Sequence, residues 1–376
     1  MRQNAARTDS SAVLHVGMDL GLKSWKLAMT TGLGQKPRIR TVPAGDLERF
    51  DVELSRAKKR FGLSECAPVK SCYEAGRDGF WIHRWLLSIG VENHVVDPSS
   101  IEVDRRRRRR KSDRLDATQL VVRLVRSGLG DRTWSVVVVP SVEAEDGRHL
   151  HRSLDTLTKE RTRIVNRIRG ILISHGLRLD PRLVTFLEDL SESRQWDGSP
   201  VPPGLQARVR VEWDRLQAVG EQIKAIEQER DRLLEEGEGV VVEQVDQLCK
   251  LKGVGIKSAW LLSRELFSWR PYQNRRTAGS LIGLAPTSYG SGTISRELGI
   301  SKAGNRRVRA VAIQLAWSWI RSEPNSPITH WFQERYAKGS GRARRVGIVA
   351  VARKLIIALW RYVDQGVVPE GAILKA

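Results

Sequence analysis

The sequence has few of the residues that cross-link a chain or anchor it in a membrane. Only three cysteines occur, at Cys66, Cys72 and Cys249, and their spacing fits neither a zinc site nor a disulfide framework. No apolar run approaches the roughly 20 residues of a membrane-spanning helix, and the first residues lack the apolar stretch of a secretory signal. The seven histidines form no metal-ligand constellation. We therefore expect a cytoplasmic protein of bacterial type with no membrane partner.

Acidic residues are scarce compared with basic ones. The 376 residues include 64 Lys plus Arg against 43 Asp plus Glu, which gives a formal net charge of +21. Clustered cations gain affinity for nucleic acids because they release counterions from the phosphate backbone. The charge balance therefore predicts a nucleic acid as partner and an association with the nucleoid. The chain length predicts two or three domains.

The first third of the chain alternates between strand and helix patterns. The segments "VLHVGMDLG", "WKLAMT" and "PRIRTV" follow one another at hairpin spacing and predict an antiparallel meander. A helix, the strand "PVKSCYEAG", a second helix, the strand "ENHVVDPS" and the helix "SDRLDATQLVVRLVRSG" come next. Three strands, helix, strand, helix, strand, helix is the element order of the ribonuclease H-like fold. We predict a mixed α/β domain over residues 11–130.

The remainder of the chain is mainly helical in pattern. Heptad spacing, for example at Val209, Leu216 and Ile223, predicts a coiled-coil helical hairpin over residues 145–238, interrupted by "SESRQWDGSPVPPG". The hairpin is either an intramolecular spacer or a dimerisation arm. Residues 239–365 are predicted to form a separate helical domain that contains the Gly- and Ser-rich loop "GLAPTSYGSGTISRELGISKAGNRR".

Four carboxylates stand at strand and helix ends of the predicted α/β domain. Asp19 and Glu74 end two apolar strands, while Asp113 and Asp116 lie at i and i+3 on one helix face. Carboxylates that converge repel one another unless a cation lies among them, and hard oxygen ligands select Mg²⁺ or Mn²⁺. Two such ions can activate a nucleophile and stabilise a leaving oxygen in phosphodiester chemistry. Each residue alone also fits a turn or a helix start, but the set predicts a metal site.

A dense basic run precedes the second pair of carboxylates. Its members are Arg105, Arg106, Arg107, Arg108, Arg109, Arg110 and Lys111. Such runs are usually solvated segments or address signals. Beside a predicted metal site, we favour the interpretation that this run binds phosphates.

Two segments of the C-terminal part are further candidates for contact with DNA. The glycines of "LKGVGIKSA" stand between apolar helical stretches, as in helix-hairpin-helix modules, where the N–H groups of a helix start bind a phosphate; such a turn can also merely join two helices. The predicted phosphate contacts are Gly253, Gly255, Lys257, Arg306 and Arg307. In "SYGSGTIS", Ser291 has glycine on both sides, so its hydroxyl is open to attack a phosphodiester, although serine in such a loop is more often a turn residue.

In this order, the segments resemble the transposases of the 110-type insertion sequences, also called DEDD transposases. The resemblance rests on "GMDLG", "YEAG", "KSDRLDA", "LKGVG", "GLAPTSYGSG" and "ISKAGNRRVR" and covers nearly the whole chain. It implies a RuvC-like domain with a four-carboxylate magnesium site and a C-terminal domain whose catalytic serine corresponds to Ser291. It also implies excision and insertion of an element through a circular intermediate and a covalent phosphoserine. A structured bridge RNA would guide a homodimer or homotetramer.

Three other protein classes share parts of this pattern. Sugar kinases and actin-like ATPases also begin with a segment like "GMDLGLKSWKLAM". A member of this class would have a second phosphate loop and a near-neutral net charge, and neither is present. A RuvC-like metal-dependent nuclease would need no serine. A nucleic-acid-binding protein without catalysis would be expected to lack a carboxylate or the serine, and all five are present. The nuclease and the non-catalytic binding protein remain as alternatives.

Overall fold

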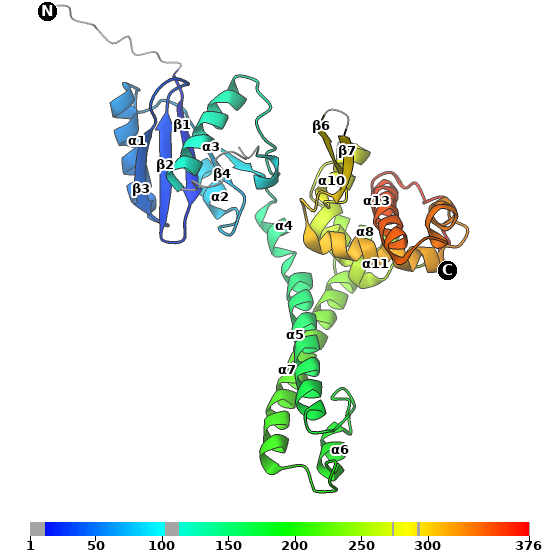
Figure 1. Ribbon diagram of the computed structural model, residues 1–376. Helices are drawn as coiled ribbons and strands as arrows, with labels where there is room; N and C mark the ends of the chain where they lie inside the picture. Colours follow the sequence, from blue (N-terminus) through cyan, green and yellow to red (C-terminus); the bar gives the residue numbers. More distant parts are fainter. Residues whose placement is uncertain (1–11, 102–112, 273, 292–293, 376) are drawn as a thin grey trace, which may run out of the picture. The chain divides into compact units, whose positions relative to one another are not determined.

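The chain folds into two compact units, residues 1–139 and 140–376, and each has its own apolar core (Figure 1). The computed structural model describes residues 12–101, 113–272, 274–291 and 294–375, with the backbone alone at 113–114, 276, 288–291 and 294–298. No helix among these residues is long and apolar enough to cross a membrane. The fold is a mixed sheet with helices in the first unit and a mostly helical second unit.

The first unit is built on a five-stranded mixed sheet. Its strands are β1 (Leu14–Leu20), β2 (Ser24–Thr30), β3 (Arg38–Pro43), β4 (Val69–Glu74) and β5 (Glu92–Val96). Strands β1 to β3 form the predicted antiparallel meander, and β4 and β5 run parallel to β1, in the spatial order β3-β2-β1-β4-β5. The predicted element order of this part of the chain is confirmed.

Helices cover both faces of this sheet. They are α1 (Leu47–Phe61), α2 (Trp81–Ser88), the short η1 (Pro98–Ser100) and α3 (Asp113–Gly128). Val16 and Met18 of β1 share a core with Phe50 of α1 and Ile82 of α2. Because side chains alternate along a strand, Gly17 and Asp19 lie on the opposite face, which α3 covers.

Gly17 brings the backbone of α3 directly onto β1. A Cβ atom at this position would lie 2.5 Å from the carbonyl oxygen of Ala117 and 2.5 Å from the amide nitrogen of Val121. No side chain fits such a gap, so glycine is required for the helix to approach this closely. Ala28 on β2 completes a small cluster with Ala117 and Val121. The position of α3 on the sheet is therefore set by backbone contact.

The second unit begins with two long helices. Its first elements are α4 (Val142–Asp146), α5 (His149–Ile173), α6 (Phe186–Glu192) and α7 (Pro203–Glu235). Helices α5 and α7 lie along each other (Figure 1) and bury a shared apolar seam that includes Ile168, Val209 and Ile223. Arg167 also pairs with Glu212 across the two helices at 2.7 Å. The predicted long helices are present, and their seam is buried within a single chain; a coiled-coil or assembly role stays a prediction.

The rest of the second unit is helical apart from one hairpin. Its elements are α8 (Val240–Cys249), α9 (Ile256–Leu262), the π-helical turn η3 (Ser263–Phe267), α10 (Arg275–Leu281), β6 (Pro286–Ser291), β7 (Ile294–Ile300), α11 (Arg306–Ser322), α12 (Pro327–Phe332), η4 (Gln333–Ala337) and α13 (Gly341–Gln365). Trp260, Trp319 and Leu355 lie in its core. The prediction of a loop over the whole Gly- and Ser-rich segment is wrong, because β6 and β7 pair there through backbone hydrogen bonds. Strand pairing uses backbone N–H and C=O groups, which glycine and serine have like other residues. The prediction failed because a high content of glycine and serine is typical of turns.

Candidate active site

Asp19 and Glu74 stand at the carboxyl ends of two neighbouring parallel strands. Met18 of β1 lies opposite Tyr73 of β4, so the next residues along each strand, Asp19 and Glu74, are at the same level. Cys72 precedes Glu74 by two residues, and its thiol is 3.6 Å from the carbonyl oxygen of Leu120 on α3. By strand alternation both carboxylates therefore lie on the face that α3 covers.

Asp113 and Asp116 lie in the first turn of α3. Asp113 precedes the buried Ala117 by four residues, and Asp116 precedes the buried Leu120 by four. Asp116 is also bonded directly to Ala117, whose carbonyl oxygen faces Gly17. The first unit thus places two acidic strand ends on the face covered by a helix whose first turn carries two aspartates.

The four carboxylates are the donor type that a hard cation requires. Mg²⁺ and Mn²⁺ prefer carboxylate oxygens, and these four residues belong to β1, β4 and α3, which contact one another. Among the side chains that the structure describes, no three from His, Cys, Asp or Glu gather closely enough to hold an ion, and the side chain of Asp113 lies outside that set. A site for Mg²⁺ or Mn²⁺ at these residues stays a prediction. The basic run from Arg105 to Lys111 also lies outside the described residues.

Ser291 is the last residue of β6 and lies next to the turn of the hairpin. It pairs with Ile294, whereas Ser288 pairs with Glu297 further from the turn, beside a register shift. The base of the hairpin is fixed by backbone pairing, because the amide of Ser301 donates to the carbonyl of Ala285 at 2.9 Å. Ser291 is therefore at the turn end of the hairpin.

The side chain of Arg309 forms hydrogen bonds with the chain segments on both sides of this hairpin. Its Nη1 donates to the carbonyl of Ile282 and to that of Lys302, each at 3.1 Å. The first residue precedes β6 and the second follows β7. Arg309 therefore stabilises the base of the hairpin from its position on α11.

A buried carboxylate, Glu265, connects three elements of the second unit. It lies in the π-helical turn η3 and accepts hydrogen bonds from His151 Nε2 at 2.8 Å and from Arg152 at 2.8 and 3.1 Å. It also accepts a hydrogen bond from the side-chain Nδ2 of Asn305 at 2.9 Å. The side-chain Oδ1 of Asn305 caps α11 by accepting from two backbone N–H groups. Burial alone would raise the pKa of Glu265, but the hydrogen bonds from His151 and Arg152 hold it well below its usual range.

Sequence reasoning did not select Glu265. The one available signal is a pair of charged residues, Arg264 and Glu265, inside the apolar stretch "WLLSRELF", and π-helical turns are frequent at functional sites. Its partners on α5 lie 113 and 114 residues earlier in the chain, so no local pattern reveals them.

We expect Glu265→Gln to destabilise the second unit by about 3 kcal/mol near neutral pH, because it leaves Arg152 and His151 without their buried anion. The lowered pKa means that the carboxylate stabilises the fold above the ordinary glutamate pKa of 4.5 and loses this effect as the pH falls below it. The difference between the variant and the parent should therefore shrink in acid. Urea unfolding followed by circular dichroism at several pH values measures this.

Glu229→Gln is the matched control, because Glu229 forms an exposed ion pair with Arg232 on α7. Exposed pairs contribute little, so this variant should unfold as the parent does. Equal behaviour of the two variants would show that Glu265 is not a structural centre of this unit.

Comparison with known proteins bears on the whole chain. Residues 245–336 match the model of a family described as "Transposase IS116/IS110/IS902 family". The chain is 42% identical to a putative transposase, y4rJ, of Sinorhizobium fredii over 99% of its own length and 96% of that protein. It is 24% identical to the transposase for insertion sequence element IS1328 of Yersinia enterocolitica, over 84% of this chain and 90% of that one. The chain belongs to the IS116/IS110/IS902 family of transposases.

The matched region of this transposase contains the turn with Gly253 and Gly255, the buried Glu265, and the β6–β7 hairpin with Ser291. In the turn, Gly253 has a φ of 87° and accepts a hydrogen bond from Ser318 of α11 at 2.9 Å, while a Cβ there would lie 2.7 Å from the Ser322 hydroxyl. The positive φ, together with the nearby Ser322 side chain, thus favours glycine here. Gly255, the N-cap residue of α9, is exposed with open space around it, and its contact with phosphate stays a prediction.

The three predicted basic contacts of the transposase differ in their surroundings. Lys257 is exposed but forms an ion pair with Glu227 of α7. Arg307 lies 3.5 Å from Asp155 of α5, and Arg306 is exposed. Arg306 is thus the predicted contact at the start of α11 that is exposed to solvent.

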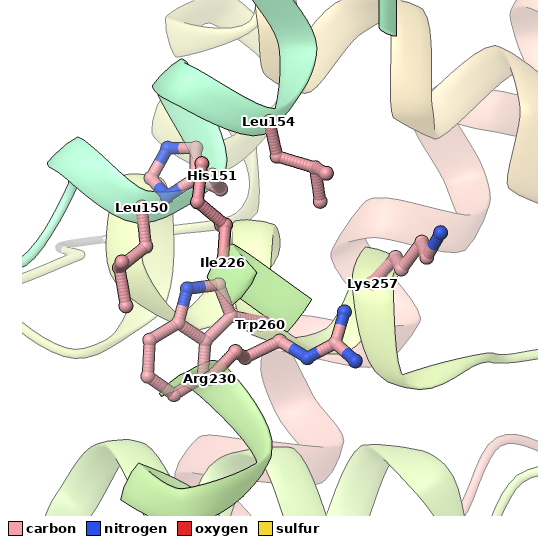
Figure 2. Close-up of a pocket in the computed structure, with 7 residues that line it drawn as sticks. All are labelled: Leu150, His151, Leu154, Ile226, Arg230, Lys257 and Trp260. Atoms are coloured by element: carbon pink, nitrogen blue, oxygen red, sulfur yellow. The ribbon is translucent and has the colours of Figure 1, made fainter. Parts of the chain in front are cut away.

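A small pocket lies where the long helices of the transposase meet α9. Figure 2 shows Trp260 beside Arg230, whose side chain extends toward Lys257, with His151 on the α5 side. The charged groups here already have protein partners: Arg230 pairs with Asp231, Lys257 with Glu227 and His151 with Glu265. We interpret this pocket as a structural junction.

Proposed function

We propose that this protein excises and inserts its own insertion sequence by cutting and rejoining DNA. The observation that carries the proposal is the pair Asp19 and Glu74 at level strand ends, on the sheet face covered by the helix that carries Asp116. The strand order β3-β2-β1-β4-β5, with β2 antiparallel to β1, supports a RuvC-like, ribonuclease H-like domain. Membership of the transposase family supports DNA as the substrate.

In the proposed reaction, Ser291 is the nucleophile. Its hydroxyl oxygen attacks the scissile phosphorus, the bond from phosphorus to the leaving strand breaks, and the leaving oxygen takes up a proton. A hydroxyl of the second strand then attacks the phosphoserine and releases Ser291. Each step exchanges one phosphate ester for another, so the reaction needs no separate energy source.

The carboxylates would act on the charge that develops during these exchanges. Asp19, Glu74, Asp113 and Asp116 would hold Mg²⁺ or Mn²⁺, which when bound would stabilise the attacking and leaving oxygens. Without a cation these acidic groups would repel the phosphate, so the site and its metal are a single proposal.

The partners of the reaction are also proposals. The net charge of +21 supports simultaneous binding of DNA and of a guide RNA encoded by the element. The paired helices α5 and α7 would serve as an assembly arm for a homodimer or homotetramer, although their apolar seam is already filled within one chain. The protein would work in the cytoplasm, at the nucleoid.

The test is a recombination assay with purified protein, donor DNA, target DNA and RNA transcribed from the noncoding end of the element. We expect joined product with Mg²⁺ and none after chelation by EDTA, because the carboxylate site requires the ion. Omission of the RNA should abolish joining of the matched sites. Product formed in EDTA would contradict the metal site, and product formed without RNA would contradict the guide.

A further inference from the structure

Two tryptophans near the start of α5 hold arginine side chains in fixed positions. The guanidinium carbons of Arg148 and Arg270 lie 4.4 and 4.6 Å from the ring centre of Trp269. Arg264 lies 4.6 Å from the ring centre of the buried Trp260. Stacking on an aromatic face orients the planar guanidinium and reduces the entropy lost when it binds a partner.

The three arginines are neighbours in space. A Cβ on Gly147, the residue before Arg148, would lie 2.6 Å from Nη1 of Arg264, so that guanidinium rests against the backbone beside Arg148. Arg148 is 6% exposed, and burial is the main cause that lowers the pKa of all three arginines. The three positive charges thus share one partly buried region.

Several N–H groups of these residues are buried without an acceptor in the described part of the chain. Nε and Nη2 of Arg148 and the Nε atoms of Arg264 and Arg270 are buried without a hydrogen-bond partner there, and so is the indole N–H of Trp269. No ion pair within that part engages any of the three guanidinium groups. The Nη groups of Arg264 and Arg270 are not among these buried atoms and have no hydrogen bond within the described residues, so they can donate to a partner that supplies oxygens.

The neighbouring carboxylate cannot serve as that partner. Glu265 is adjacent to Arg264 in sequence, and its charge acts on Arg148. Both of its oxygens are already taken, by Arg152 and His151 on one side and by Arg152 and Asn305 on the other. Glu265 is therefore committed to Arg152, His151 and Asn305. The charges of Glu145 and Asp146 also act on Arg148 and Arg264, respectively, but no ion pair joins them within the described residues.

We propose that Arg264 and Arg270, stacked on Trp260 and Trp269 beside the buried Arg148, form a binding site for the phosphodiester backbone of a nucleic acid. Guanidinium groups bind phosphate oxygens in pairs, and aromatic stacking holds them in place for this. Such contacts set the position of the strand and carry no base sequence. The site rests on the proposed function in one respect: the transposase must bind DNA or RNA at all.

The test measures binding of the full-length double variant Arg264→Gln, Arg270→Gln by fluorescence anisotropy. The probes are a labelled DNA duplex and a labelled structured RNA, each titrated at several salt concentrations. We expect about a tenfold loss of affinity, and a fall of about 1 to 2 in the slope of log affinity against log salt. Loss with the duplex alone assigns the site to DNA, loss with the RNA alone assigns it to the guide, and loss with both assigns it to a shared path.

The matched control is Arg182→Gln, Arg232→Gln, which removes the same charge from arginines that are paired with Asp180 and with Glu229 and Glu236. Its affinity should change by no more than about twofold. Unchanged binding of the first variant to both probes, or an equal loss in the control, overturns the proposal. If the first variant does not fold, Arg270→Lys keeps the charge and loses the planar fork, and we then expect about a threefold loss.

The binding assay involves no catalysis, so its outcome is separate from that of recombination. A protein that binds through these arginines but joins no DNA would contradict the proposed reaction and leave this site intact. If the parent protein recombines DNA and the arginine variant binds normally, the arginine site is contradicted and the proposed reaction is kept.

Discussion

Asp116→Asn is expected to lower strand exchange by at least about a thousandfold while DNA and RNA binding stay within about twofold of the parent. The substitution keeps the size of the side chain and removes one negative charge from the predicted metal site. Because Asp116 directly precedes the contact between α3 and Gly17, the change should not disturb the approach of helix and strand. The assay is joined product as a function of Mg²⁺ concentration, with half-maximal activity expected to shift to higher Mg²⁺.

The control for this prediction is Asp131→Asn, an exposed aspartate beyond the end of α3. It removes the same charge from the same unit without touching the sheet face that carries Asp19 and Glu74. We expect parental exchange rates from it. Full exchange by Asp116→Asn would remove Asp116 from the metal site, and equal losses in both variants would point to net charge instead.

Ser291→Ala is expected to eliminate both joined product and the covalent protein–DNA adduct, because no other group in the proposal bonds to phosphorus. The loss should be complete within detection, and binding should be unchanged, since only one hydroxyl oxygen is removed. The adduct is measured as DNA that migrates with the denatured protein on a gel. It should be visible for the parent protein with a substrate that traps the first exchange.

Ser288→Ala separates Ser291 from the other serine of strand β6. Ser288 pairs with Glu297 away from the turn, whereas Ser291 ends the strand. The Ser288 variant should form adduct and product normally. If Ser288→Ala is inactive and Ser291→Ala is active, the nucleophile is Ser288 and the assignment of Ser291 is wrong. Activity in both variants would leave a nuclease without a serine as the better explanation.

The sequence revealed the first unit well because its signals are local. Alternating apolar residues mark the strands, and the abrupt ends of two of them place Asp19 and Glu74 at element termini. Once the element order is recognised, adjacency of β1 and β4 follows, and with it the level position of the two carboxylates. Gly17 gave no such signal, because only the fold shows that a helix backbone lies above it.

The second unit was less predictable because its decisive contacts are distant in sequence. The hairpin of β6 and β7 has residues typical of a turn, and its strands are specified by pairing with each other. Glu265 meets His151 and Arg152 only after more than a hundred residues have folded around it. The same holds for Arg148 above Trp269, because more than a hundred residues separate the two in the chain.

The contact of α3 with Gly17 also determines how the first unit responds to heat. Two backbones in direct contact have no side-chain rotamers to exchange, so thermal motion cannot loosen them gradually. Helix and strand must instead move together as one rigid body or separate altogether. Asp19 and Asp116 flank this contact, so their spacing should persist up to the unfolding transition and disappear with it. Warming should therefore end catalysis abruptly, together with the fold of this unit.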